Sequence, residues 1–176
     1  MPMQRESTSV RVLAIDLRLS RFAYAVYEGP KRLLDWGGRA CPPSKGADLA
    51  AQRVVELLRL FHPAVVVMKK DRRGGVRNAP VLRRVANQVR HEAAIRSVPV
   101  FLCSPEEVKE AFRIFRVRTK DDVAAAVAGI FPELLWELPR KRKKWDNEHP
   151  RMAVFDAISI GFAYFQRNGT RVPPDE

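Results

Sequence analysis

Val12-Leu13-Ala14-Ile15-Asp16 is an apolar run that ends on a carboxylate, and the chain that follows it decides the fold. Two further β-type runs come soon after it, at Phe22 to Tyr27 and at Arg32 to Arg39. Connections as short as these join antiparallel strands, so residues 10–39 predict a three-stranded antiparallel meander. Asp16 is then expected at the point where a central strand leaves the core.

Farther along the chain, helical patterns alternate with apolar runs. Asp48 is a candidate N-cap for a helix that ends before His62-Pro63, and residues 79–96 repeat apolar side chains at helical spacing. Ala64 to Met68 and Val98 to Cys103 are apolar runs of the kind found in buried strands. Strands separated by helices need right-handed crossovers and parallel neighbours, so the sequence predicts a mixed five-stranded sheet flanked by helices.

The second half of the chain is expected to be helical. Ser104-Pro105-Glu106-Glu107 has a capping Ser, a Pro at the first helical position and a Glu three residues after the cap. Thr119-Lys120-Asp121-Asp122 predicts a second helix start, and a last helix is expected over about residues 150–167. The sequence therefore predicts one α/β domain over residues 10–167, with flexible ends at 1–9 and 168–176.

Composition narrows the class of protein. The chain has 176 residues, 46% of them hydrophobic, which is enough for a folded core without disulfides or structural metals. Apolar runs such as Val123 to Phe131 are far shorter than the ~20 residues that cross a bilayer, so no membrane-spanning segment is expected. Met1 to Ser9 has no apolar core of a secretory signal, and a cytoplasmic protein is the expectation.

The net charge of +12 is concentrated in two segments. Residues 67–96 contain nine basic and two acidic side chains, and residues 109–144 contain ten and five, whereas the rest of the chain is neutral. Clustered Lys and Arg favour a phosphate backbone as partner. Two alternatives use the same basic surface: solubility with nonspecific RNA binding, or an adaptor for acidic proteins.

The candidate nucleic-acid-binding residues are the cations of these segments. They are Lys69, Lys70, Arg72, Arg73 and Arg77, then Arg116, Arg118 and Lys120, then the run Arg140, Lys141, Arg142, Lys143 and Lys144. Trp136 and Trp145 bracket that run. They are candidates to stack on unpaired bases, and the alternative is that Trp136 belongs to the core and Trp145 anchors the segment.

Two carboxylates are candidates for chemistry. Asp16 ends the first apolar run, and Asp156 is the one acid in a helix that is apolar almost all the way round. An ionised carboxylate in such a helix needs a cation, several donors or a metal to offset its desolvation. The structural alternative is a satisfied buried acid, for example Asp156 paired with an Arg and Asp16 capping a turn.

These elements and acids resemble the ribonuclease-H-like superfamily, and within it the RuvC-type Holliday junction resolvases. Val12 to Asp16 resembles the family's first strand with its catalytic Asp, and Asp156-Ala157 resembles its C-terminal Asp-Ala. Residues 104–109 and 118–123 resemble its Pro-x-x-Val-Lys and basic helix-opening segments. The resemblance covers about residues 10–166 in element order.

The resemblance implies a cluster of acids that holds Mg²⁺ or Mn²⁺ for phosphodiester cleavage, with Asp16 and Asp156 as metal ligands. Two family acids are replaced: one corresponds to Met68 or Lys69, and the other to Ala153. The ammonium of Lys69 would repel a divalent ion at this site. Glu148 is the expected third catalytic residue; Asp71 and His149 are the other possible replacements.

Two functions follow from the resemblance. The first is a metal-dependent endonuclease that acts on branched DNA of the Holliday-junction type. The second is a protein that keeps the fold and the basic face, binds DNA or RNA, and has lost catalysis. The resemblance also implies a homodimer, because a four-way junction has two symmetric cuts to make.

Overall fold

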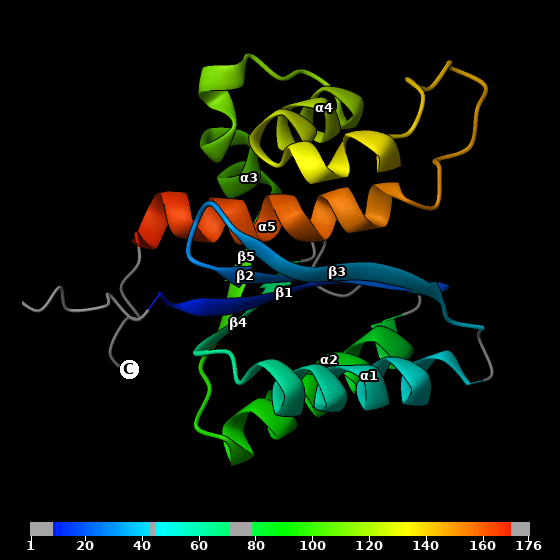
Figure 1. The fold of residues 1–176 in the computed structure, drawn as a ribbon. Coiled ribbons are helices and arrows are strands. Elements are labelled where there is room, and N and C mark those ends of the chain that lie inside the picture. Colours follow the sequence, from blue (N-terminus) through cyan, green and yellow to red (C-terminus); the bar gives the residue numbers. More distant parts are fainter. Residues whose placement is uncertain (1–8, 43–44, 71–78, 170–176) are drawn as a thin grey trace, which may run out of the picture.

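A computed structural model describes residues 9–42, 45–70 and 79–169. The expected flexible ends fall largely outside these residues, and Asp71, Arg72, Arg73 and Arg77 lie wholly outside them. The order of elements is that of the prediction: three strands, a helix, a strand, a helix, a strand, then helices (Figure 1). The mixed α/β architecture is therefore confirmed.

The five strands form one sheet with the order β3-β2-β1-β4-β5. Their bounds are β1 Arg11–Arg18, β2 Arg21–Glu28, β3 Leu33–Ala40, β4 Val65–Lys69 and β5 Val100–Cys103. β1 pairs antiparallel with β2 and parallel with β4, and β5 pairs parallel with β4. The meander and the parallel crossovers are both confirmed, and β1 is the central strand.

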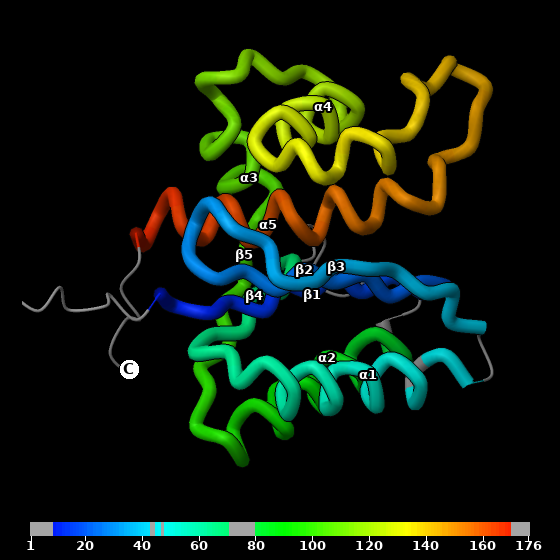
Figure 2. The backbone as a smooth tube through the Cα atoms, in the orientation of Figure 1, coloured from blue at the N-terminus to red at the C-terminus, as the bar shows by residue number. Residues whose placement is uncertain are grey.

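Helices cover both faces of the sheet (Figures 1 and 2). α1 Gly46–Phe61 and α2 Ala79–Ile95 lie on one face, and α5 Met152–Asn168 crosses the other. α3 Pro105–Ala111, α4 Lys120–Ile130 and the 3₁₀ turns η1 Arg113–Phe115 and η2 Pro132–Glu137 are beyond α5. Each face has its own apolar core, and the inner strands β1, β2 and β4 are buried on both sides.

A close approach between Tyr27 and Gly161 fixes α5 on the sheet. A Cβ atom at Gly161 would lie 2.3 Å from the Tyr27 ring, so no larger residue fits this crossing without a shift of the ring or the helix. The Tyr27 hydroxyl donates to the carbonyl oxygen of Ile158. Because Asp156 lies two residues before Ile158, this contact also sets where the Asp156 carboxylate meets the sheet.

The predicted caps are confirmed at two helices and wrong at one. Ser104 and Thr119 each form a capping box, with Glu107 and Asp122. Asp48 caps nothing: α1 begins two residues before it, and Asp48 pairs instead with Arg84 at 2.7 Å. A carboxylate in the first turn still interacts favourably with the helix dipole, which is why it suits that place.

Two strand predictions also need correction. β1 continues for two residues past Asp16, so this carboxylate lies within the strand and not at its end. β5 is an edge strand, and Leu102 on it is exposed, so the expected buried strand is only partly buried. Among the described residues, no helix is both long enough and apolar enough to span a bilayer.

Candidate functional site

The centre of the candidate site lies on β1. Side chains alternate between the two faces of a strand, so Asp16 and Arg18 point to the same face, where α5 lies. Asp16 is fully buried. Lys69 ends β4, and the register pairs Ile15 with Met68, so Lys69 lies beside Asp16 on the neighbouring strand.

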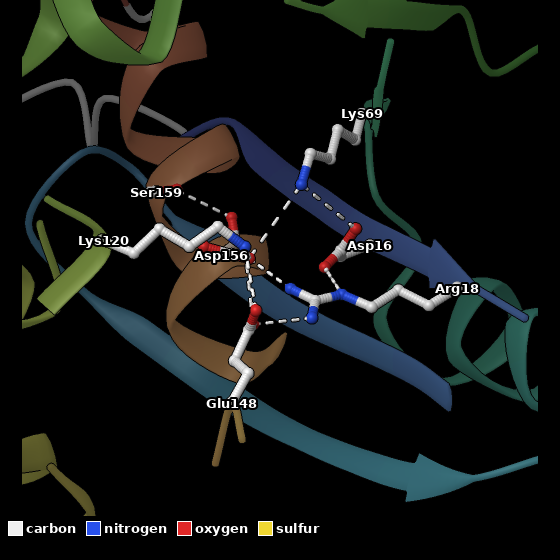
Figure 3. Close-up of polar contacts among 7 residues, drawn as sticks. All are labelled: Asp16, Arg18, Lys69, Lys120, Glu148, Asp156 and Ser159. Atoms are coloured by element: carbon white, nitrogen blue, oxygen red, sulfur yellow. Dashed lines mark hydrogen bonds and ion pairs between the residues drawn. The ribbon is translucent and has the colours of Figure 1, made fainter. Parts of the chain in front are cut away.

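Arg18 binds all three candidate catalytic carboxylates (Figure 3). Its Nε donates to Asp16 Oδ2 at 2.8 Å, and its Nη1 donates to Glu148 Oε1 at 2.7 Å. Its Nη2 donates to Asp156 Oδ2. The planar guanidinium, with five N–H donors, thus joins acids from β1, from the start of α5 and from the segment before α5.

Two lysines complete the arrangement. Lys120 Nζ lies 3.2 Å from Asp156 Oδ2 and 3.3 Å from Glu148 Oε2. Lys69 Nζ lies 3.9 Å from both Asp16 Oδ1 and Asp156 Oδ2. We call these six residues the ion cluster: Asp16, Arg18, Lys69, Lys120, Glu148 and Asp156. It has three carboxylates and three cations, so its formal charge is zero.

Burial and charge act against each other on the acids and on Arg18. Burial raises the pKa of Asp156, although Lys120 and Lys69 oppose this. Burial would also raise the pKa of Glu148, but its hydrogen bond to Arg18 and the charges of Arg18 and Lys120 lower it. Burial would lower the pKa of Arg18, but Asp16, Glu148 and Asp156 raise it above its ordinary value. Arg18 therefore stays charged inside the cluster.

The ion cluster does not fit a pair of divalent cations. Mg²⁺ needs oxygen ligands at about 2.0–2.1 Å in a nearly octahedral arrangement. Here the carboxylates surround a guanidinium, and Lys69 lies equally far from an oxygen of Asp16 and one of Asp156. Among the described residues, no group of three or more His, Cys, Asp or Glu side chains is spaced to hold a metal ion.

One oxygen of the cluster is still open to a further ligand. Asp16 Oδ1 is buried and accepts no hydrogen bond from the described residues. Lys69 Nζ lies 3.9 Å from it, a distance beyond a hydrogen bond. A buried carboxylate oxygen without a donor is costly, so this atom is where an additional cation or donor would gain most.

Solved structures similar to this chain are resolvases of four-way DNA junctions. RuvC of Thermus thermophilus in complex with its Holliday junction substrate has a TM-score of 0.68 and 25% identity, over 92% of this chain and 98% of that one. A second Thermus thermophilus RuvC structure has a TM-score of 0.69 and 24% identity, over the same shares. The chain has the RuvC fold.

Two more distant structures share this RuvC-like fold. The yeast mitochondrial Holliday junction resolvase has a TM-score of 0.54 and 20% identity, over 90% of this chain and 80% of that one. The fowlpox virus Holliday junction resolvase also has a TM-score of 0.54, at 14% identity, over 90% and 99%. No protein-family model and no curated protein sequence matches the chain.

The RuvC-like fold brings together the three acids that the sequence indicated, but His149 does not join them. Glu148 joins Asp16 and Asp156 through Arg18. His149 is exposed, and its Nδ1 accepts the backbone N–H of Arg151, away from the ion cluster. The structural alternative for Asp156, an acid paired with an Arg, is what the structure contains.

Sequence reasoning missed Arg18, the residue that touches most of the cluster. The signal that could have found it is the two-residue period of a strand. An Arg two positions after a buried Asp lies on the same face and can reach the same partners. The prediction ended the strand at Asp16, and this hid the relation.

The candidate DNA-binding cations lie around the cluster and beyond it. Lys120 belongs to it, while Lys70, Arg116 and Arg118 are exposed. The exposed run from Arg140 to Lys144 lies in residues 138–151, which we call the connector because they join η2 to α5. The connector is held against the start of α4, where the backbone N–H of Arg142 donates to Asp121 at 3.3 Å.

Proposed function

We propose that this protein binds branched DNA of the four-way-junction type and holds its carboxylates with Arg18, Lys69 and Lys120 in place of divalent metal ions. The observation that carries the proposal is the guanidinium of Arg18, which donates to Asp16, Glu148 and Asp156 together. An acid bound to a cation in this way has lost most of the negative potential that attracts a divalent ion.

The DNA part of the proposal rests on charge and on fold. Lys70, Arg116, Arg118 and the connector run are exposed cations. Lys70 directly follows Lys69, Arg118 lies two residues before Lys120, and the connector run lies a few residues before Glu148. Cations of this kind bind phosphates and release condensed counterions. The RuvC structure from Thermus thermophilus, similar to this chain over nearly its whole length, is in complex with a Holliday junction. A junction has two-fold symmetry, so we propose a homodimer as the binding form.

A metal-dependent endonuclease is the second candidate, and Asp16 Oδ1 is the observation that favours it. This buried oxygen has no hydrogen-bond partner among the described residues, and Mg²⁺ or Mn²⁺ prefers oxygen ligands. The residues that would hold the ion are Asp16, Asp156 and Glu148. This candidate requires Arg18 and Lys69 to leave their present contacts, since both repel a cation in that space.

Cleavage and binding assays on the same DNA separate the two candidates. Labelled four-way junctions and flaps are incubated with Mg²⁺ and with Mn²⁺, using wild type, Asp16→Asn and Lys69→Glu, and binding is measured in EDTA. We expect wild type to bind the junction in EDTA and to leave it uncut with either metal. Cleavage by wild type that Asp16→Asn abolishes would establish the second candidate. Failure to bind any junction at low salt would overturn both.

The Lys69→Glu variant tests whether the lysine at position 69, where the family has an acid, prevents metal binding. It places a carboxylate beside Asp16 and removes an ammonium that lies 3.9 Å from Asp16 Oδ1. We expect stronger Mn²⁺ binding than in wild type, measured by calorimetry. The matched control is Lys70→Glu, which makes the same charge change at the next residue, an exposed one that lies just past β4. Equal Mn²⁺ binding by the two variants would argue against a role for Lys69 in blocking metal.

A further inference from the structure

The two tryptophans that bracket the basic run from Arg140 to Lys144 are largely exposed. Trp136 on η2 has 72% of its surface exposed, and Trp145 in the connector has 79%. The expectation that Trp136 belongs to the core is therefore wrong. The indole is the largest apolar side chain, and leaving two of them in water forgoes much of the burial that stabilises a fold.

Trp136 is presented by a well-anchored turn. Its neighbour Leu134 is fully buried, and Glu137 accepts a hydrogen bond from the Trp36 indole on β3 at 2.8 Å. η2 is thus fixed to the sheet on both sides of Trp136, and the ring still points away from the core. Its exposure comes from an ordered backbone and not from a loose end of the chain.

A cation lies over the face of each exposed ring. The guanidinium of Arg151 is 5.9 Å from the centre of the Trp136 ring, and the ammonium of Lys143 is 5.6 Å from that of Trp145. The segment that carries Lys143 is itself ordered, because its backbone N–H donates to Asp146 at 3.0 Å. Each indole is therefore paired with a positive charge in a basic stretch of chain.

An aromatic face beside several cations fits a particular class of ligand. Nucleobases stack on aromatic rings, while the phosphates between them bind Lys and Arg. In a paired duplex the base faces are covered by their neighbours, so this kind of contact needs unpaired nucleotides. An acidic protein would use the cations but would have no need of two exposed indoles, and an apolar partner would not need the run from Arg140 to Lys144.

We infer that Trp136 and Trp145 form a stacking site for unpaired nucleotides, with the connector cations holding the flanking phosphates. This inference rests on the proposed function and names the part of the DNA that this surface takes. The connector, which carries Trp145, is linked to the ion cluster: Arg142 donates to Asp121, and the preceding residue, Lys120, contacts Glu148 and Asp156.

The test compares DNA with and without unpaired bases. Fluorescence anisotropy gives the Kd for a single-stranded oligo(dT), a junction with a short unpaired thymine tract at its branch, and a fully paired linear duplex. The double variant Trp136→Leu/Trp145→Leu is compared with Trp136→Phe/Trp145→Phe, which keeps an aromatic face at both places. Ile114→Ser is the matched surface control, because Ile114 is as exposed as the tryptophans and lies on η1.

We expect the Leu variant to bind oligo(dT), and the junction with the unpaired thymine tract, at least tenfold more weakly than wild type. Its affinity for the linear duplex should stay within about twofold, and the Phe variant should keep most of the affinity for unpaired DNA. In wild type, oligo(dT) should quench tryptophan fluorescence, and the Leu variant, which leaves Trp36 as its one tryptophan, should lose that quenching.

Three results would overturn the inference. They are an unchanged Kd for oligo(dT) in the Leu variant, an equal loss on oligo(dT) and on the duplex, and an equal loss in the Phe and Leu variants. Each of them is compatible with junction binding by wild type, so each leaves the proposed function standing. If wild type binds none of the DNAs at low salt, the proposed function has failed first, and the stacking site fails with it.

Discussion

The ion cluster and the connector differ in charge: the cluster is neutral, and the connector has an excess of cations. In the cluster every cation has a carboxylate partner, and Arg18 has three. In the connector, five consecutive cations from Arg140 to Lys144 are exposed, and the carboxylates nearby, Asp121 and Asp146, accept backbone N–H groups. The charges of the ion cluster are therefore paired within the protein, whereas the cations of the connector run are exposed and can bind phosphate.

This difference assigns two roles, DNA binding and stabilisation of the fold, to two separate regions. An exposed, unbalanced run of cations gains free energy when it replaces the counterions of a phosphate backbone. A neutral, partly buried cluster gains little from phosphate, but it holds five segments together, namely β1, β4, α4, the connector and α5. We therefore assign DNA affinity mainly to the connector, and stability mainly to the cluster.

The largest expected effect is on stability, from Arg18→Ala. Removal of the guanidinium leaves the fully buried Asp16 without its hydrogen-bonded partner, and breaking a buried pair typically costs about 3–5 kcal/mol. We expect a loss near the lower value, because Arg18 and Glu148 are partly exposed. Urea unfolding followed by circular dichroism gives the free energy of unfolding.

A double variant tests whether the loss of stability comes from the pair of Arg18 and Asp16. In Arg18→Ala/Asp16→Asn the buried charge is removed together with its partner, so part of the lost stability should return. If the double variant is as unstable as the sum of the two single variants, the pair is not coupled, and the cluster is not the stabilising unit that we describe.

The next effect is on DNA binding, from replacement of Lys141, Arg142, Lys143 and Lys144 by Ala. We expect roughly tenfold to hundredfold weaker junction binding near 0.1 M salt, and a shallower dependence of log K on log[salt], by about 0.9 for each lost phosphate contact. The control Arg59→Ala/Arg90→Ala removes exposed cations from α1 and α2, on the opposite face of the sheet. Equal losses in the two variants would mean that affinity is not concentrated in the connector.

The fold and the ion cluster differ in how much of each could be predicted from the sequence. The antiparallel meander, the parallel crossovers and two helix starts each depend on short stretches of sequence, and patterns of spacing predicted them. Asp16 and Asp156 could also be named, because an acid at the end of or inside an apolar run is anomalous on its own, and Glu148 because it lies just before the last helix. The two-residue period of β1 could have placed Arg18 beside Asp16, but that its guanidinium also meets Glu148 and Asp156 depends on tertiary packing.

The exposed tryptophans illustrate the other limit. Trp136 lies in a stretch that reads equally well as core or surface, and only the packing of η2 decides between them. Leu134 takes the inward position and Glu137 is tied to Trp36, so Trp136 faces outward. Hydrophobicity predicts burial on average, but a two-turn segment has too few residues to show a clear period.

A smaller effect is expected in the pH dependence of stability. The pKa of Glu148 is lowered in the folded state. At pH values between that lowered pKa and the ordinary value of about 4.3, Glu148 therefore binds a proton more readily in the unfolded chain than in the folded one. The contribution of Glu148 is therefore present above this window and lost as the pH falls through it. Glu148→Gln should flatten the acid limb of the stability curve, by less than about 1 kcal/mol because the side chain is partly exposed.

Asp156 is the matched control, because its shift has the opposite sign. Burial raises its pKa, so the folded state keeps a proton at pH values where the unfolded chain has lost it. Its stabilising contribution is then greatest at low pH and falls as the pH rises through the raised pKa. Asp156→Asn should steepen the acid limb that Glu148→Gln flattens. A change in the same direction in both variants would contradict the assignment of these shifts.

The smallest expected effect is the response of wild type to Mg²⁺. A ligand that binds only the folded state stabilises it by RT ln(1 + [L]/Kd), which is about 1.4 kcal/mol at ten times Kd and raises Tm by roughly 3–6 °C in a chain of this size. Because Arg18, Lys69 and Lys120 already neutralise the carboxylates, we expect less than about 1 °C between EDTA and about 10 mM Mg²⁺. In Arg18→Ala/Lys69→Glu the same addition should raise Tm by several degrees, because two cations are gone and a fourth acid is present. A rise in wild type as large as in this variant would mean that the cations yield to metal, and the contrast between a closed cluster and an open connector would then hold only in the absence of the ion.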